Sequence, residues 1–365
     1  MGEPHRIGIV GLGVISKQYL ATFRSHPGVQ IVAVADLDSS RAELVAREID
    51  GCRAMSVERL MTDPSVETVV NLTIPSAHAG IALAALARGK NVYGEKPFAV
   101  MFADAERIMA AAGSAWAGGA PDTVLGTGVQ TARRVIDEGG IGRPISATAT
   151  FTSSGPERWH PQPDFYYRQG GGPLLDMGPY YLTSLVHLLG PVVRVTGASS
   201  RPRETRIIES GPRAGERIPV DIDTHITGSL EHLGGAVSTV MFSFDAVATG
   251  AAPIEVHGES GSMSVPDPNN FDGDVRVFAH GGSDWSLVPP SAGYESAGRG
   301  IGVIDFARGH RRASGDLALH VLEIMTELLR SAREGRRIDL TTTADRPELV
   351  PFTSEREWRE GSPSA

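Results

Sequence analysis

Residues 11–16 read Gly-Leu-Gly-Val-Ile-Ser, and they directly follow the apolar, strand-like run Ile7–Val10. A helical pattern over Lys17–Ser25 comes next. A G-x-G-x-x-[GAS] motif is informative when it stands in this way between a strand and a helix. Gly11 permits the tight turn, and Gly13 lets the backbone approach a pyrophosphate held at the helix N-terminus. The motif predicts a dinucleotide-binding turn, and the alternative is a glycine-rich turn without a ligand.

Asp36 stands at the end of the second apolar run, Ile31–Ala35, about 20 residues after the glycines. A carboxylate at this point can accept hydrogen bonds from the ribose hydroxyls and would repel a 2′-phosphate. Leu37, rather than an arginine, follows it. These residues favour NAD over NADP, although Arg41 keeps NADP open. The alternative role for Asp36 is an ordinary helix N-cap.

Strand and helix patterns alternate over the first third of the chain. Strands that are apolar on both faces, each followed by a helix, indicate a parallel sheet covered on both sides. We therefore predict an α/β fold that begins with a Rossmann NAD(P)-binding domain over residues 1–125. Its strands are expected at Ile7–Val10, Ile31–Ala35, Thr68–Leu72, Asn91–Tyr93 and Ala115–Gly119, and its helices at Lys17–Ser25, Ser40–Ile49, Ala77–Arg88 and Asp104–Ala112.

From about residue 145 the apolar pattern changes to period two, as in strands with one buried face. We predict that residues 126–365 form a substrate-binding and oligomerisation α/β domain with a mostly antiparallel sheet. Residues 201–219 and 289–300 are expected to be loops, and the tail after Glu355 is expected to be disordered. Strands are expected at Ile145–Phe151, Thr224–His232, Ala236–Phe244, Ile254–His257, Ser262–Val265, Val275–Ala279 and Trp285–Val288, and helices at Thr131–Glu138, Pro179–Leu189 and Asp316–Glu334.

The composition excludes several classes of function. The chain has 365 residues, which suits two domains, and a net charge of −9, which disfavours nucleic acid and anionic membranes as partners. Its single cysteine, Cys52, excludes an intrachain disulfide and fits a reducing compartment. We find neither a membrane-spanning apolar run nor a signal peptide, and the 11 histidines show no metal-ligand spacing. We therefore expect a soluble cytoplasmic protein without a metal.

Lys96 follows the predicted fourth strand in the tripeptide Glu95-Lys96-Pro97. Ligands of open α/β sheets bind at the carboxyl ends of the strands, so this amine is expected at the site. Oxidation of an alcohol by hydride transfer requires a base that removes the hydroxyl proton. A free lysine is protonated at neutral pH and therefore cannot accept this proton. Partial burial and a cationic nicotinamide ring would lower its pKa and allow it to act as the base. The alternative is a surface lysine at a strand end.

Asp176 and Tyr180 stand four residues apart after the run Gly170-Gly171-Gly172. We expect Gly178 to be the N-cap and Pro179 the first residue of the following helix. A carboxylate near this helix start would raise the pKa of Lys96 and keep the amine charged, whereas burial would lower that pKa. Lys96 is then either the base or a charge that activates Tyr180 or the substrate hydroxyl. Our prediction is Lys96 as proton carrier, Tyr180 as hydroxyl donor to the reacting oxygen and Asp176 as the group that orients them.

A loop before the triple glycine is dense in aromatic and hydrogen-bonding side chains, which suits a sugar ring. The alternative is a structural lid in which these aromatic rings are merely packed. Asp122, after the predicted fifth strand, is a further candidate for the pocket. The predicted substrate-binding residues are Lys96, Asp122, Arg158, Trp159, His160, Tyr166, Arg168, Asp176 and Tyr180.

Several motifs together resemble the Gfo/Idh/MocA family of glucose–fructose oxidoreductase, inositol dehydrogenase and their relatives. The residues that carry the resemblance are Gly11–Ser16, Thr73-Ile74-Pro75 with His78, Gly89-Lys90-Asn91-Val92, Glu95-Lys96-Pro97, Ile141-Gly142-Arg143-Pro144 and Gly170–Tyr180.

The resemblance implies a Rossmann domain followed by a domain with a large open sheet, through which family members form homodimers or homotetramers. It also implies a cis Lys96–Pro97 peptide bond. Inositol dehydrogenases carry a histidine where this chain has Tyr180, so the chain here resembles the glucose–fructose oxidoreductase and dihydrodiol-dehydrogenase branches. The cofactor-binding residues that motif and resemblance assign are Gly11, Gly13, Val14, Ile15, Asp36, Thr73, Ile74, Pro75, His78, Glu95 and Lys96.

The sequence therefore predicts an NAD(P)-dependent oxidoreductase, a dehydrogenase or ketoreductase that transfers a hydride between nicotinamide and a carbon of a sugar, sugar derivative or cyclitol. Two alternatives stay open. One is a redox-neutral sugar epimerase or eliminase that retains NAD. The other is a non-catalytic nucleotide-sensing regulator on the same scaffold, because a fold does not determine its function.

Overall fold

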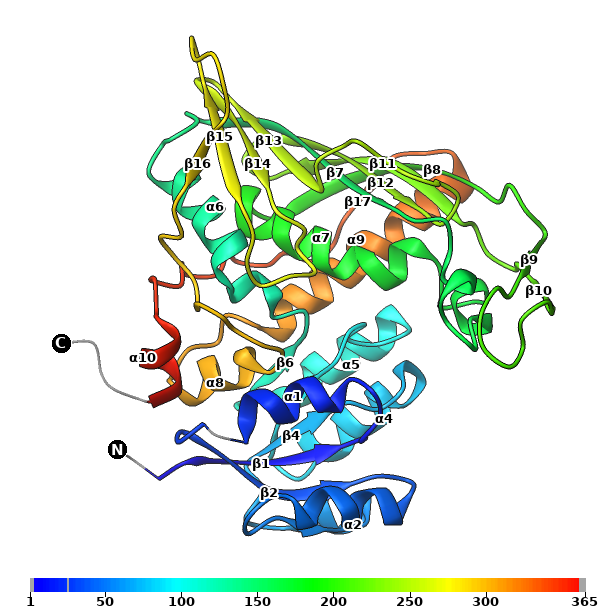
Figure 1. Ribbon diagram of the computed structural model, residues 1–365, viewed down its shortest axis with the longest axis vertical. Coiled ribbons are helices and arrows are strands. Elements are labelled where there is room, and N and C mark those ends of the chain that lie inside the picture. Colours follow the sequence, from blue (N-terminus) through cyan, green and yellow to red (C-terminus); the bar gives the residue numbers. More distant parts are fainter. Residues whose placement is uncertain (1–2, 25, 361–365) are drawn as a thin grey trace. The chain divides into compact units, whose positions relative to one another are not determined.

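The computed structural model describes residues 3–24 and 26–360 (Figure 1). By its internal contacts the chain divides into two compact units. The first unit contains the described residues up to Gln130, the segment Ser291–Leu319 and the described residues from Pro347 onward. The second contains Thr131–Pro290 and His320–Arg346.

The first unit holds a parallel sheet, and in the described part of the chain this sheet has six strands in the order β3-β2-β1-β4-β5-β6. This order is that of a Rossmann fold, in which ligands bind beyond the carboxyl ends of the strands where the order reverses. Side chains on both faces of the central strands, such as Ile7, Ile9 and Val69, are fully buried. The strands are β1 (His5–Val10), β2 (Val29–Ala35), β3 (Arg53–Ala54), β4 (Thr68–Asn71), β5 (Asn91–Gly94) and β6 (Ala117–Gly119).

Helices connect these strands, as the alternating sequence pattern predicts. Asp38 caps the second of them, since its carboxylate accepts from the backbone N–H groups of Ser40 and Arg41. The alternative reading of Asp36 as this N-cap is therefore wrong. The short elements β3 and α3 have no counterpart in the predicted pattern, and Ser25, the predicted end of α1, lies outside the described residues. The helices are α1 (Ser16–Phe23), α2 (Ser39–Arg47), α3 (Val57–Thr62), α4 (Pro75–Leu86) and α5 (Phe102–Ala112).

Two late segments of the chain pack into the first unit, with helices α8 (Ile301–Ala307) and α10 (Glu355–Glu360). Trp358 of α10 is fully buried; its indole N–H donates to the Glu295 carbonyl oxygen at 2.8 Å, and its ring stacks on His26. The tail was expected to be disordered after Glu355, and through Glu360 this expectation is wrong. Burial of one large aromatic side chain orders a segment whose local sequence is strongly polar.

The second unit is built on a mixed sheet with the strand order β16-β15-β14-β13-β7-β12-β11-β8-β17 over the residues described. All neighbouring pairs are antiparallel except β7 and β12, which confirms the predicted, mostly antiparallel sheet. The strands are β7 (Pro144–Thr152), β8 (Val192–Ser200), β11 (His225–His232), β12 (Val237–Ser243), β13 (Ile254–Gly258), β14 (Gly261–Val265), β15 (Val275–Ala279), β16 (Ser286–Val288) and β17 (Ile338–Asp339).

Helices cover one face of this sheet, as the ribbon shows for α7 (Pro173–Leu189) and α9 (Gly315–Glu334) (Figure 1). Gly197 of β8 and Gly228 of β11 are paired, and a side chain at Gly228 would overlap the Leu328 side chain of α9 at 2.6 Å. Glycines at this pair therefore let the helix approach the sheet closely. A further α-helix is α6 (Thr127–Asp137).

A small hairpin, β9 (Thr205–Ile207) with β10 (Arg217–Pro219), forms a separate two-stranded sheet in the second unit. This stretch was expected to be an irregular loop, and for these six residues the expectation is wrong. Ile208, Ile218 and Val220 lie buried around the hairpin, against Tyr167 and Phe244. This small apolar cluster accounts for the hairpin. Its strands are too short for an alternation of apolar and polar residues to predict them from the sequence.

Candidate functional site

The glycine-rich turn after β1 has the geometry that the motif predicts. Gly11 adopts φ +93°, and a Cβ placed on it would lie 2.7 Å from the backbone of Leu72, so a side chain is excluded there. Gly13 has no heavy atom within 4 Å of the position of a Cβ, and its backbone is therefore open to approach. The Ser16 hydroxyl donates to the Gly13 carbonyl oxygen at 2.7 Å, which ties the turn to the start of α1.

The Asp36 carboxylate lies against the same turn. It accepts from the Leu12 backbone N–H at 2.7 Å and from the Asp38 N–H at 2.9 Å. The Arg41 guanidinium lies 3.4 Å away at the surface. Two backbone donors hold Asp36 beside the glycines at the end of β2, which is where a carboxylate meets the ribose of a bound dinucleotide.

Three large apolar side chains at the carboxyl ends of neighbouring strands face solvent. Val14 follows β1 and is 88% exposed, Leu37 follows β2 and is fully exposed, and Ile74 follows β4 and is 68% exposed. Isolated exposed apolar residues are ordinary, but here one follows each of three adjacent strands. A dinucleotide lying across this edge would cover them. With the open backbone at Gly13 and the carboxylate of Asp36, the residues present fit the cofactor.

Glu95 connects helix α1 to the backbone of Lys96. The carboxylate is buried; one oxygen accepts from the Tyr19 hydroxyl of α1 at 2.7 Å, and the other accepts from the Lys96 N–H at 2.9 Å. Burial, and next the Glu95 charge, raise the pKa of Tyr19 well above its usual value, so the phenol stays a proton donor. The Lys96–Pro97 bond is cis, which confirms the expectation from the resemblance.

His78 lies on the other side of the same segment. The ring is 2% exposed, and its nitrogens lie 2.7 Å from the Pro97 carbonyl oxygen and 3.0 Å from that of Thr73. The Asn71 side chain in turn donates to the His78 carbonyl oxygen at 3.0 Å. A backbone carbonyl oxygen thus lies against each ring nitrogen, and the nitrogen that carries the proton donates to its neighbour. His78 therefore packs between the Thr73–Pro75 turn and the lysine segment instead of presenting a nitrogen to solvent.

Asp122 differs from its predicted role. The side chain has no exposed surface, and one carboxylate oxygen accepts from the backbone N–H groups of Gly300 at 2.8 Å and Gly302 at 3.0 Å. Burial raises the pKa of the Asp122 carboxyl, and the backbone donors oppose that shift. Asp122 therefore holds the start of α8 within the first unit, and we leave it out of the proposed substrate site.

Asp176 and Tyr180 lie on one helix, α7. This helix begins at Pro173, with Gly172 as N-cap, so the predicted N-cap at Gly178 is wrong and Pro179 lies inside the helix. Asp176 stands in the first turn, where the helix dipole favours a carboxylate. Tyr180 stands one turn later on the same side and is almost completely buried. Both residues are thereby placed on a regular, rigid element.

The loop before α7 carries an exposed aromatic cluster, made by Trp159, His160, Phe165 and Tyr166. The Phe165 and Tyr166 rings lie 4.0 Å apart, and Tyr166 also meets Trp159 edge-on at 6.3 Å. Trp159 is 63% exposed and Phe165 is 55% exposed. Rings left this far in solvent are available to a ligand, and aromatic faces suit the C–H face of a sugar.

A buried ionic network that sequence reasoning missed anchors this loop. Arg206 of β9 bonds to Glu157 at 2.9 Å and to Asp245 at 2.5 Å, and the Tyr167 hydroxyl donates to Glu157. Burial, and next the bond to Glu157, raise the pKa of Tyr167 above its usual value. The sequence holds no signal for this pairing, because the partners are about 40 to 50 residues apart and belong to an irregular stretch.

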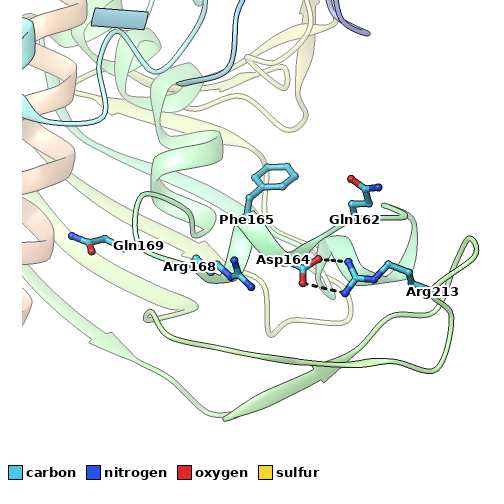
Figure 2. A pocket seen from close by; sticks show the side chains of 6 residues that line it. All are labelled: Gln162, Asp164, Phe165, Arg168, Gln169 and Arg213. Carbon is cyan, nitrogen blue, oxygen red and sulfur yellow. Dashed lines mark hydrogen bonds and ion pairs between the residues drawn. The ribbon is translucent and has the colours of Figure 1, made fainter. Parts of the chain in front are cut away.

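Beside the aromatic cluster lies a pocket of about 380 Å³, shown in Figure 2. Arg168, one of the predicted substrate residues, lines it, whereas Arg158 is exposed and pairs with Glu209 at 3.6 Å. No group of side chains in residues 3–24 and 26–360 could hold a metal ion, and none of the helices described there is both long and apolar enough to span a membrane.

Two family models match the chain. The model described as an oxidoreductase family with an NAD-binding Rossmann fold matches residues 5–116, and the model of the GFO/IDH/MocA C-terminal domain matches residues 129–264. Together they span most of both units.

Individual relatives are more distant. Over 216 residues the chain is 31% identical to dTDP-3,4-didehydro-2,6-dideoxy-alpha-D-glucose 3-reductase of Streptomyces antibioticus, covering 56% of this chain and 63% of that protein. It thus spans just under two thirds of that relative. It is 30% identical over 274 residues to trans-1,2-dihydrobenzene-1,2-diol dehydrogenase of Bos taurus, covering 72% of this chain and 74% of that protein.

The fold also matches a solved structure of an NAD binding oxidoreductase from Klebsiella pneumoniae. The TM-score is 0.81 at 22% sequence identity, and the match covers 93% of this chain and 100% of the other. At this identity the likeness shows the fold: an N-terminal Rossmann domain for NAD and a C-terminal domain with a mixed sheet.

Proposed function

The chain belongs to the Gfo/Idh/MocA family of NAD-binding oxidoreductases, and from this premise we propose that it is an NAD-dependent dehydrogenase or ketoreductase of a hydroxylated ring, meaning a sugar, sugar derivative or cyclitol. The observation that carries the proposal is the position of Lys96. Its backbone is held from α1 through Glu95 and from α4 through His78, at the sheet edge that also carries the glycine turn and Asp36.

NAD, when bound, supplies the hydride acceptor, and NADH supplies the donor. The chain's own residues bind and orient it: the turn at Gly11 and Gly13 receives the pyrophosphate, and Asp36 accepts from the ribose hydroxyls. A bound dinucleotide would cover the exposed side chains of Val14 and Ile74. Since the Asp36 carboxylate would repel a 2′-phosphate, we propose that NAD is preferred to NADP.

The remaining residues handle the substrate proton. In oxidation the Lys96 amine takes the proton of the hydroxyl group, and in reduction it returns a proton to the oxygen. Tyr180 donates a hydrogen bond to the reacting oxygen, and Asp176 orients the two groups. Relatives named for a deoxy-sugar and for a cyclic diol support a ring with oxygen substituents as the substrate. The exposed aromatic cluster supports the same class.

A panel of sugars and cyclitols, each assayed with NAD and NADP at the nicotinamide absorbance, tests this proposal. The Lys96→Met variant should lose turnover at least 100-fold while NADH fluorescence still reports binding. If Lys96 and Tyr180 act on one oxygen, the double variant Lys96→Met with Tyr180→Phe should lose less than the product of the two single losses. Tight NADH binding without turnover of any member of the panel would refute the enzyme and favour a nucleotide-sensing regulator.

We also propose that the protein is a cytoplasmic homo-oligomer joined through the second unit. The supporting observation is that α7 and α9 cover one face of the large sheet, while paired residues on the other face, such as Thr148 and Thr239, are exposed. Light scattering during gel filtration should give a dimer or tetramer, and substitution of Thr148 and Thr239 by glutamate should shift it toward monomer. A wild-type monomer at micromolar concentration would refute this.

A further inference from the structure

We propose that the pocket beside the aromatic cluster binds an anionic substituent of the substrate, a carboxylate or a phosphate on the sugar. This inference rests on the proposed function, because it names the class of sugar that the second unit recognises. The pocket belongs entirely to the second unit. Its lining residues are Gln162, Asp164, Phe165, Arg168, Gln169 and Arg213.

The charges of the pocket favour an anion. Asp164 and Arg213 neutralise each other through two hydrogen bonds, of 2.6 and 3.2 Å, drawn as dashed lines in Figure 2. Arg213 is held further by Glu216 at 2.8 Å. Arg168 is exposed, and it has no carboxylate of the described residues within the 4.0 Å of an ion pair. Arg213 is thus satisfied by two carboxylates, and Arg168 is the lining arginine whose guanidinium faces the pocket without an ion pair to the described residues. Together with the hydrogen bond from Arg213, the Arg168 charge lowers the pKa of Asp164.

The uncharged lining residues suit the rest of a sugar. The Phe165 ring stands out from the loop, with Gln162 on one side of it and Gln169 on the other (Figure 2). Its exposed face can pack on the C–H face of a pyranose ring, and the two amides can each donate to and accept from hydroxyl groups. A guanidinium binds carboxylate or phosphate through two parallel N–H groups, so Arg168 would also fix the orientation of the ligand.

The backbone around Arg168 is ordered and leads directly to the proposed catalytic helix. The Gly171 N–H donates to the Arg168 carbonyl oxygen, and the Gly172 N–H to that of Tyr166, both at 2.8 Å. Gly172 is the N-cap of α7, and Asp176 follows in its first turn. Arg168 thus stands eight residues before Asp176 on a continuous, hydrogen-bonded path.

The binding experiment uses the full chain and Arg168→Gln, with Arg168→Lys as the conservative variant. Arg276→Gln is the matched control, because Arg276 is an exposed arginine of β15 paired with Asp274. Inorganic phosphate, D-glucuronate and D-glucose are titrated by calorimetry at low and high salt. We expect both anions to bind wild type and the control. Arg168→Gln should weaken them about 10- to 100-fold, the effect of a lost charge-assisted hydrogen bond, and Arg168→Lys should weaken them less.

The turnover experiment compares the neutral and anionic members of the sugar panel. Wild type should favour the anionic member of a matched pair at least 10-fold in kcat/KM, with a preference that falls as salt rises. Arg168→Gln should lose that preference, whereas the control Arg276→Gln should keep it. Binding of phosphate alone would assign the site to phosphorylated sugars, and binding of glucuronate alone to sugar acids.

The outcomes separate the two proposals. If neither anion binds, or if Arg168→Gln binds them as wild type does, the anion site is refuted whatever the enzyme turns over. If the anions bind through Arg168 but no member of the panel is oxidised or reduced, the proposed enzyme fails while the site stands.

Discussion

Replacing Arg206 with methionine tests how the substrate loop is held. Methionine has a similar length and no charge, so it removes the guanidinium while keeping most of the volume. Arg206 is 2% exposed and donates to Glu157, to Asp245 and to the Phe244 carbonyl oxygen at 3.1 Å. The variant leaves the buried Glu157 carboxylate without its cation and leaves Asp245 with only the more distant Arg203.

The expected cost follows from these partners. Removing one partner of a buried ion pair typically costs about 3–5 kcal/mol, because an uncompensated charge stays buried. Both carboxylates lose the Arg206 guanidinium, but the Tyr167 hydroxyl still donates to Glu157, and Asp245 keeps the Thr224 hydroxyl and the Arg203 side chain. We therefore expect a loss of about 4 kcal/mol. For a domain of this size that lowers Tm by roughly 8–16 °C.

Thermal melting followed by circular dichroism measures this loss, and limited proteolysis locates it. Cleavage should appear first between residues 153 and 172, where the network anchors the loop. Arg203→Met is the matched control, since Arg203 is more than half exposed and lies 3.8 Å from Asp245, so it should cost less than about 1 kcal/mol. Adding Glu157→Gln to Arg206→Met should recover part of the loss. A fall in Tm under 3 °C, with the loop still resistant to protease, would refute the reasoning.

Four further predictions concern the cofactor side of the molecule and its pH dependence. Gly11→Ala places a methyl group against the Leu72 backbone at a residue whose φ is +93°. The affinity for NADH, measured by fluorescence, should therefore fall at least 100-fold. An affinity within threefold of wild type would contradict this. Asp36→Ser should raise kcat/KM with NADP relative to NAD at least 10-fold, and an unchanged ratio would remove Asp36 from the ribose site. The leucine of His78→Leu cannot donate a hydrogen bond to the Pro97 or Thr73 carbonyl oxygen, so kcat should fall about 10-fold or more while NADH still binds. His78→Asn should restore part of the lost kcat. A drop in Tm with a normal kcat would mean that His78 has a purely structural role. Burial lowers the pKa of His320 to about 4, whereas the unfolded chain takes up that proton near pH 6.5. His320 should therefore contribute a loss of about 3 kcal/mol in the free energy of unfolding as pH drops from 6.5 to 4. Urea unfolding of His320→Gln should show a dependence on pH that is smaller by this amount, and an identical dependence would refute the assignment.

Local sequence was sufficient wherever neighbouring residues alone decide a structure. The strand–turn–helix around Gly11 is of this kind, because a tight turn with positive φ leaves glycine as the residue that fits. The parallel sheet followed from strands that are apolar on both faces, and the antiparallel one from period-two alternation. The lysine motif, the aspartate–tyrosine pair and the aromatic loop were likewise visible, since each is a short run of chemically distinctive residues.

Tertiary contacts decided what those residues do. His78 and Glu95 were recognisable as motif members. Only the fold shows that His78 of α4 contacts the Pro97 carbonyl oxygen and that Glu95 links Tyr19 of α1 to the Lys96 N–H. The sequence predicted Asp122 as a pocket residue, but its carboxylate accepts hydrogen bonds from Gly300 and Gly302 at the start of α8. The order of α10 around Trp358 and the buried charge of Arg206 depend on partners distant in sequence. Free energy at such places comes from burial and from pairing of polar groups across the fold, and no local pattern encodes which partners will meet.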